Sequence, residues 1–204
     1  MTIKDAKRNV VTDAATRLFL SRSIAGVTIR DIAREAGVGE ATVYRYFAGK
    51  TPLIVACALK LQEEVGRYFL PARAGENGYA RLARFYGAYA ELFVSRPELY
   101  RFLYEFDAYC VSEGVSGLDE YADNMDLFKE AYLSAYRDGL SDGSVAPLPD
   151  PALFYYATTH AVLSLAKKLA VEDRIVRQDA FTDRVDEIRT LSDAILLNLR
   201  PARL

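Results

Sequence analysis

Apolar residues recur along this chain at intervals of three and four, which is the spacing of one face of an amphipathic helix. The first such stripe lies within a helix predicted over about residues 3–22, and five more predicted helices carry the same spacing between residues 82 and 199. No segment shows the sustained alternation of apolar and polar residues that marks a half-buried strand. Three further helices are predicted between residues 28 and 70, so the sequence predicts an all-α fold of about nine helices.

The most informative pattern lies between Thr28 and Lys50. Thr28 is placed to cap a short helix, with Asp31 three positions later as its reciprocal partner. Gly37 should end that helix, because glycine takes the left-handed backbone conformation without a steric cost. A second short helix is then predicted over residues 39–46. Two short helices around a tight turn form a helix-turn-helix, which places its second helix in the major groove of DNA.

The residues of this stretch also resemble a known family. The order T-I-R-D-I-A-x-x-A-G-V-x-x-x-T-V-Y-x-Y-F-x-x-K is similar to the DNA-binding signature of the TetR (tetracycline-repressor-like) transcriptional regulators. The similarity covers roughly the first 60 residues. One departure is Ser23-Ile24, where the family often has glycine followed by an aromatic residue.

The resemblance implies two domains joined by a long helix. Residues 1–50 would form the helix-turn-helix DNA-binding domain, and a connecting helix would follow over about residues 51–70. Residues 71–204 would form a helical bundle for ligand binding and dimerisation, and Pro71–Gly78 reads as a linker because of its Pro and Gly content.

Phosphate contacts supply most of the affinity of a DNA-binding protein, through cations, hydroxyls and helix N-termini. At the matching positions the resemblance implies such contacts by Thr28, Tyr44, Tyr46 and Lys50. Base reading is expected from Glu40, Thr42 and Arg45. Arginine favours guanine, threonine can touch the methyl group of thymine, and a carboxylate can accept from cytosine. The alternative is that both tyrosines are ordinary core residues, which is the place expected for Phe47.

The charge of the chain is unevenly distributed. The net charge is −2, but residues 1–60 hold ten Lys/Arg and five Asp/Glu, whereas residues 61–204 hold sixteen and twenty-three. The N-terminal part is therefore basic and the remainder acidic, which suits a protein that presents one end to phosphates.

A single recognition helix is too small to specify an operator, so two-fold pairing is expected. Pairing places two such helices about 34–36 Å apart, on successive major-groove faces. The last two predicted helices are the candidates for a four-helix dimer interface, through Ala157, Ala161, Ser164, Leu165, Ile188, Leu191, Ser192, Ile195 and Leu199. The alternative is that both stripes pack only within their own subunit.

The remainder of the chain is rich in aromatic residues, which points to a ligand cavity between helices. The candidate lining residues are Tyr86, Tyr89, Phe93, Tyr104, Tyr109, Met125, Phe128, Tyr132, Phe154 and His160. The alternative for each is a place in the core. One histidine without neighbouring cysteines or a carboxylate cluster makes no metal site. We therefore expect neither a metal nor a cofactor.

Several classes of protein are disfavoured by the sequence. There is no nucleophile–base pair and no phosphate-cradling glycine loop, so an enzyme is not expected. The start lacks the apolar segment of a signal peptide and no apolar run is long enough to span a membrane, so a cytoplasmic location is expected. Cys57 and Cys110 are then expected to be reduced thiols.

These observations favour a ligand-responsive transcriptional regulator. The expected form is a repressor that binds a palindromic double-stranded operator as a homodimer and is released by a small apolar or aromatic effector. An activator of the same fold and a helical small-molecule sensor that does not bind DNA are the alternatives. The sequence leaves the effector, the operator and the regulated genes open.

Overall fold

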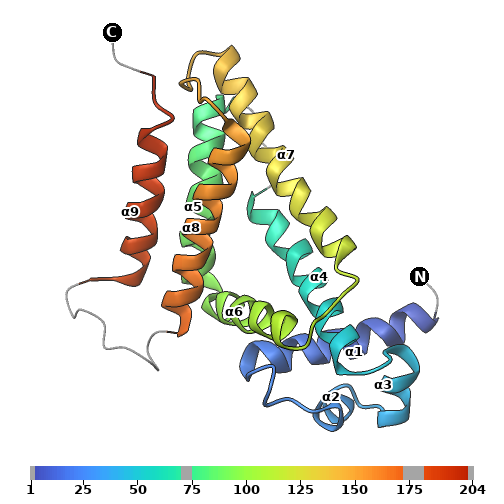
Figure 1. The fold of residues 1–204 in the computed structure, drawn as a ribbon. Helices are drawn as coiled ribbons and strands as arrows, with labels where there is room; N and C mark the ends of the chain where they lie inside the picture. Colours follow the sequence, from blue (N-terminus) through green and yellow to red (C-terminus); the bar gives the residue numbers. More distant parts are fainter. Residues whose placement is uncertain (1–2, 70–74, 172–181, 202–204) are drawn as a thin grey trace. The chain divides into compact units, whose positions relative to one another are not determined.

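Nine helices make up the residues that the computed structural model describes, which are 3–69, 75–171 and 182–201 (Figure 1). This confirms the predicted all-α fold. Their bounds are α1 (Ile3–Ser21), α2 (Ile29–Glu35), α3 (Glu40–Tyr46), α4 (Lys50–Phe69), α5 (Gly78–Ser95), α6 (Pro97–Ser112), α7 (Asp119–Ser141), α8 (Pro151–Val171) and α9 (Arg184–Leu197).

The chain forms two compact units. The head unit comprises residues 1–64 and 101–121, and the body unit comprises residues 65–100 and 122–204. The sequence division placed all residues after 70 in one C-terminal domain. The structure instead groups most of α6 with the N-terminal helices, because side chains of α6 bond to the end of α1 and to the start of α4. Helices α4 and α6 each have residues in both units.

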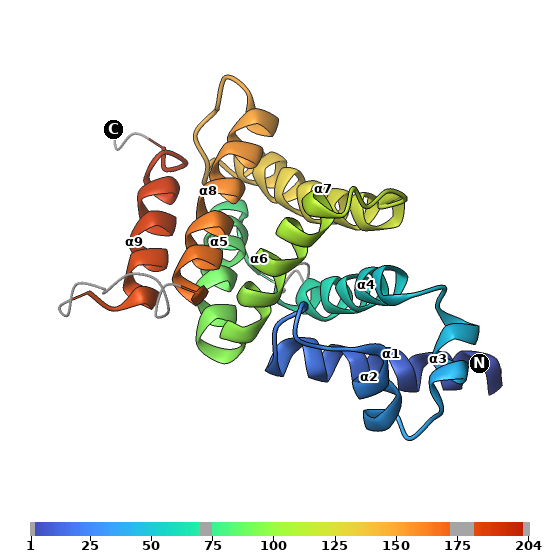
Figure 2. The same cartoon turned by 60° about the horizontal axis from the view of Figure 1, so that its bottom comes forward.

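In the head unit, α2 contacts both α1 and α3, as Figures 1 and 2 show. Phe19, Ile32 and Val43 are fully buried and supply one core residue from each of these three helices. Thr28 caps α2 with the predicted reciprocal arrangement, in which its hydroxyl accepts from the Asp31 N–H. Gly37 has φ +65°, which confirms the predicted left-handed turn after α2.

In the body unit, α5, α8 and α9 contact one another, and α7 joins them through aromatic side chains. The ring of Phe85 on α5 lies 5.8 Å from that of Tyr132 on α7 and 6.3 Å from that of Tyr155 on α8. Asp150 caps α8, and its carboxylate accepts from the Leu153 N–H at 2.9 Å.

The segment before α5 differs from the predicted linker. Residues 71–74 lie outside the described residues, but Asn77 is the N-cap of α5 and accepts from the Ala80 N–H at 2.8 Å. Gly78, expected to lie in the linker, is the first residue of α5 and is buried. The Gly-Glu-Asn-Gly composition suggested an irregular segment, whereas asparagine before a helix is a favoured cap.

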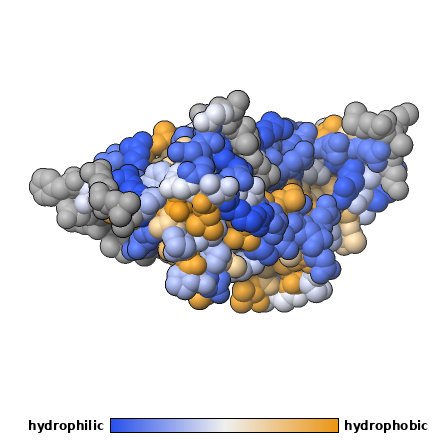
Figure 3. Space-filling view, turned by 90° about the horizontal axis from the view of Figure 1, so that it is seen from above, coloured by the Kyte–Doolittle hydropathy of each residue, from blue (hydrophilic) through white to orange (hydrophobic). Residues whose placement is uncertain are grey.

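None of the helices in the described part of the chain is long and apolar enough to cross a membrane. The face of the molecule seen in Figure 3 shows hydrophobic residues as separate patches among hydrophilic ones. The large apolar side chains that are exposed in the described residues include Leu153, Tyr156 and Leu197.

Candidate nucleic-acid interface

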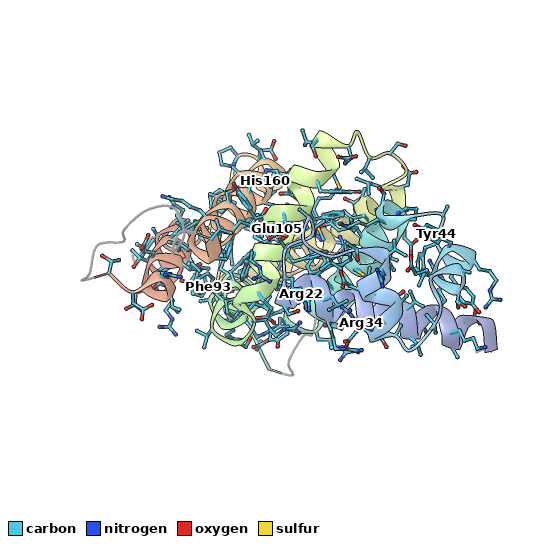
Figure 4. All side chains as sticks on the ribbon, turned by 90° about the horizontal axis from the view of Figure 1, so that it is seen from below. Arg22, Arg34, Tyr44, Phe93, Glu105 and His160 are labelled. Carbon is cyan, nitrogen blue, oxygen red and sulfur yellow. The ribbon has the colours of Figure 1, made fainter. Side chains whose placement is uncertain are left out.

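The two sides of α3 differ in exposure. Val43 is fully buried and Phe47, just after the helix, is nearly so, which is the core role expected for Phe47. On the other side Glu40 and Arg45 are exposed, and Tyr44 is 55% exposed although it is large and aromatic. Tyr44 stands on α3 and Arg34 on α2, both in the head unit (Figure 4). Tyr44 and its neighbour Arg45 therefore present an aromatic ring and a cation on the side of α3 away from Val43.

The guanidinium of Arg45 lies over the ring of Tyr46, 5.2 Å from its centroid. Tyr46 itself is half-buried. This cation–π contact restricts the conformations of the arginine side chain. A similar contact places Arg8 of α1 over the ring of Phe47, at 5.1 Å. Thr42, the remaining expected base reader, is half-buried at the start of α3.

Thr28 is exposed, but its hydroxyl is engaged in the cap. The hydroxyl accepts from the Asp31 N–H at 3.1 Å and donates to the Asp31 carboxylate at 2.6 Å. The hydrogen bonds from Thr28, side chain first and then backbone, lower the pKa of Asp31 below its ordinary value of 3.8. The same carboxylate also pairs with Arg34 at 2.6 Å. A phosphate contact by the Thr28 hydroxyl would therefore compete with its bond to Asp31.

Lys50 is the first residue of α4 and is half-buried. Burial lowers the pKa of its ammonium group. The hydroxyl of the next residue, Thr51, lies 2.7 Å from that of Tyr109 on α6. This bond fixes the backbone beside Lys50 and so limits where its charge can reach.

Three exposed residues were missing from the predicted interface. Ala41 is exposed beside Glu40 and one turn before Arg45, where a methyl group would suit contact with thymine. Arg30 and Arg34 of α2 are also exposed cations of the head unit. Their helical spacing of four was a signal in the sequence that they share one face.

The residues proposed for the ligand cavity are distributed over several environments. Tyr86, Tyr89, Phe128 and Tyr132 are buried together in an aromatic cluster of the body unit. Phe69, Phe85 and Tyr155 belong to the same cluster but were not predicted. Phe69 was overlooked because it closes the predicted connecting helix rather than starting the C-terminal domain.

Other proposed cavity residues lie elsewhere. The ring centroid of Phe93 lies 5.9 Å from that of Tyr100, and Phe154 is half-buried on α8. Tyr104 is 46% exposed, and Tyr109 bonds to Thr51 in the head unit.

Met125 and His160, which were also expected to line the cavity, are exposed. The ring of His160 lies 6.0 Å from that of Tyr156 on the outer side of α8. The described residues contain no group of three or more His, Cys, Asp or Glu that could hold a metal ion.

The aromatic cluster is uncharged at neutral pH. Burial raises the pKa of Tyr86 to about 12, and it raises the pKa values of Tyr132 and Tyr155 as well. The Tyr86 hydroxyl shares a hydrogen bond of 2.6 Å with that of Thr158 on α8. The cluster thus combines a large apolar ring surface with a small number of tyrosine hydroxyl groups.

The expected dimer residues divide between the two helices. On α8, Ala157, Ala161 and Ser164 are exposed and Leu165 is half-buried. On α9, Leu191 is half-buried, whereas Ile188, Ser192 and Ile195 are buried within the chain itself, as is Leu199 just beyond the end of the helix. The Ser192 hydroxyl donates to the Tyr86 carbonyl of α5 at 3.5 Å. The buried α9 stripe therefore packs on its own subunit, and Ala194 and Leu197 are the exposed apolar residues of this helix.

Known proteins resemble the chain in both sequence and fold. Residues 11–57 match the family model described as bacterial regulatory proteins, tetR family. Over 61 residues the chain is 43% identical to the HTH-type transcriptional regulator BetI of Brucella canis, a match that covers 30% of this chain and 31% of that relative. The sequence match thus spans about a third of the length of the curated relative.

The fold similarity extends over nearly the whole chain. A TetR family transcription regulator from Marinobacter aquaeolei has a TM-score of 0.63 and 20% identity, with 96% of each chain covered. A bacterial regulatory protein in the tetR family from Rhodococcus RHA1 has a TM-score of 0.65 and 17% identity, covering 97% of this chain and 98% of that one. At these identities the likeness shows a shared fold.

Proposed function

Because residues 11–57 match the model of the tetR family and the fold resembles that of solved structures from that family, we propose that the chain is a helix-turn-helix regulator of the TetR family and acts as a ligand-responsive repressor of transcription. In this proposal two copies bind a palindromic operator, and a small apolar or aromatic molecule releases them. The regulators of this family are not enzymes, in agreement with the sequence. A cytoplasmic location belongs to the same proposal.

The observation that carries the DNA-binding role is the exposed side of α3. Tyr44 and Arg45 project from a helix whose opposite residue, Val43, is fully buried, so the pair cannot be explained as core. Lys50 lies four residues beyond Tyr46 at the start of α4. We assign phosphate contacts to Thr28, Tyr44, Tyr46 and Lys50, and base contacts to Glu40, Thr42 and Arg45.

The proposed dimer uses the exposed side of α8. Small side chains at positions 157, 161 and 164 recur at helical spacing, and small residues allow two helices to approach closely. Leu153 of α8 and Leu197 of α9 add exposed apolar area to these helices. We therefore assign Leu197 and Ala194 in place of the buried α9 residues that the sequence suggested.

The proposed effector site is the aromatic cluster of the body unit. Its rings are neutral, and its phenol groups offer few polar anchors, which favours a molecule that is mainly apolar. A ligand that enters this cluster would change DNA binding only if it prefers the conformation that does not bind DNA. Because α4 and α6 each have residues in both units, a conformational change in the body unit could be transmitted to the head unit along these helices.

The DNA-binding role is tested with mobility shifts on the region upstream of the gene for this chain. Replacing Lys50 by alanine should weaken binding to all sequences and reduce the slope of log affinity against log salt by about 1. Replacing Arg45 should cost about 1–3 kcal/mol at one base position and relax specificity there. Arg137→Ala, an exposed charge change in the body unit, is the control and should do neither.

The same assay addresses the alternatives. A protein that shows no salt-sensitive binding to any duplex would be a helical sensor without DNA binding. A reporter gene placed under the bound region separates a repressor from an activator, since removal of a repressor raises expression. Mass spectrometry of small molecules that copurify with the protein tests the effector site, and the compound found should weaken the mobility shift.

A further inference from the structure

One side of α6 carries three polar side chains at intervals of four residues: Arg101, Glu105 and Tyr109. Residues four apart lie one above another on a helix, so these three form a continuous polar stripe. All three belong to the head unit, and each bonds to a different part of that unit. Here the stripe is called the α6 clasp.

Arg101 bonds to the end of α1. Its guanidinium donates to the Leu20 carbonyl and, at 3.4 Å, to the Arg22 carbonyl. The last carbonyls of a helix have no partner within that helix, and α1 ends at Ser21. Arg101 therefore caps α1 from a position 81 residues further along the chain.

Glu105 bonds to the loop that follows α1. Its carboxylate accepts from the Ile24 N–H at 2.6 Å and lies 4.0 Å from the guanidinium of Arg101. Figure 4 shows Glu105 on α6 beside the region of Arg22. The side chains of Arg101 and Glu105 are only 16% and 20% exposed, so water competes weakly for these bonds.

Tyr109 bonds to the start of α4, where its hydroxyl lies 2.7 Å from that of Thr51. Thr51 follows Lys50 directly. The loop held by Glu105 leads, within four residues of Ile24, to Thr28, the cap of α2. The α6 clasp therefore holds the chain next to two of the assigned phosphate contacts.

We propose that Arg101, Glu105 and Tyr109 are positioning residues for DNA binding, which hold Thr28 and Lys50 at the separation that the duplex requires without contacting DNA themselves. This inference rests on the proposed DNA-binding function. Without the clasp, the loop and the start of α4 sample other arrangements. The apparent affinity then falls in proportion to the fraction of molecules that remain competent to bind.

Because Glu105 is negatively charged, electrostatics and positioning predict opposite changes in DNA affinity when it is replaced. Glu105→Ala removes a negative charge from the head unit, so long-range electrostatics alone predicts tighter binding to DNA. Positioning predicts the opposite, with binding about tenfold weaker if the competent fraction falls to about a tenth. The salt slope should stay at the wild-type value, because no phosphate contact is lost. In Lys50→Ala, by contrast, the slope falls.

Two variants serve as matched controls. Asp107→Ala makes the same charge change on an exposed position of α6 and should bind DNA as tightly as the wild type or more tightly. Glu105→Gln keeps an oxygen that accepts from the Ile24 N–H, so it should restore near wild-type affinity. Hydrogen exchange at the Ile24 amide should be faster in Glu105→Ala than in Glu105→Gln.

Tyr109→Phe tests the other end of the clasp with a smaller change. It removes one hydroxyl and should weaken binding about threefold at an unchanged salt slope. It also serves if Glu105→Ala fails to fold, which circular dichroism at the assay temperature would reveal.

The measurement is fluorescence anisotropy of a labelled duplex from the upstream region, titrated with each full-length variant at several salt concentrations. Weak Glu105→Ala binding at an unchanged slope, with rescue by Glu105→Gln, supports the clasp. Two outcomes would overturn the clasp while the proposed function stands. One is that Glu105→Ala and Asp107→Ala bind DNA equally tightly and Tyr109→Phe binds as the wild type does. The other is that Glu105→Gln does not restore the affinity. If the wild-type chain binds no duplex, the proposed function fails and the positioning role fails with it.

Discussion

The carboxylate of Asp31 holds three groups at once: the backbone N–H of Thr28 at 3.1 Å, the Thr28 hydroxyl at 2.6 Å and the guanidinium of Arg34 at 2.6 Å. The usual residue at this place in a capping box is glutamate or glutamine, which is longer by one methylene. The shorter aspartate still completes the box here. At the scale of single residues, the entry to α2 therefore depends on one ionised group.

This dependence predicts an acid-sensitive cap. Because the pKa of Asp31 in the folded chain lies below its ordinary value of 3.8, the folded state binds fewer protons at this group than the unfolded chain does. Its stabilising effect is present above pH 3.8 and is lost as the pH falls through the folded-state value. In thermal unfolding, Asp31→Asn should be less stable than the wild type at neutral pH, and the difference should shrink in acid.

Thr28→Ala provides the control, since Thr28 supplies the largest causes of the lowered pKa. In that background Asp31→Asn should change stability much less, because residues in one hydrogen-bonded network do not act additively. By pH 3, about a unit below the ordinary pKa of aspartate, the stability difference between the wild type and Asp31→Asn should have begun to shrink. A stability difference that stays constant down to that pH would contradict this account.

At the scale of helices, α5 and α7 cross at two glycines. A methyl group at Gly78 would overlap the backbone of Gly139 and Ala135, and Gly139 in turn packs against Val145. The Asp142 carboxylate accepts from the Gly78 N–H at 2.8 Å, which fixes the start of α5. Backbone cannot move aside as a flexible side chain can, so this crossing tolerates no larger residue.

Gly78→Ala should therefore destabilise the protein by about 1–3 kcal/mol or more, the usual cost of overpacking a core. Gly87, within the same helix, is the matched control because a methyl group there meets nothing within 4 Å. Gly87→Ala should stabilise the protein by about 0.5–1 kcal/mol, since alanine favours helix. Urea unfolding of both variants checks the pair, and equal effects would contradict the proposed crossing.

At the scale of the whole molecule, the basic and acidic parts of the sequence correspond to different proposed roles, DNA contact and dimerisation. The head unit contains the basic N-terminal residues and the exposed side of α3, whereas α8 and α9 belong to the body unit. A repressor dimer would need both: one unit to contact phosphates and the other to hold two copies together.

Light scattering should therefore report a mass of about twice the 22.8 kDa of one chain. Ala161→Arg, which places a long charged side chain on the exposed side of α8, should reduce the mass to that of a monomer and weaken operator binding. Ala122→Arg makes the same change at an exposed position of α7 and should leave the dimer intact. A monomeric wild type at micromolar concentration would refute the proposed pairing.

The sequence by itself determined the local features of this protein. Helical spacing, the Thr28 cap and the turn at Gly37 depend on backbone preferences and on neighbours within four residues, so they were predicted correctly. The resemblance to the TetR family was also evident from the order of residues between Thr28 and Lys50, which lies within the stretch that matches the model of that family.

Only the tertiary structure decided which distant residues meet. The Glu105 carboxylate accepts from the Ile24 N–H across 81 residues of sequence. Tyr109 bonds to Thr51, 58 residues away in sequence, and Ile188 packs within its own subunit. An amphipathic stripe predicts that one side of a helix will be buried, but it does not predict which residues will cover that side. The hydrophobic effect has no direction, so many apolar partners satisfy it equally.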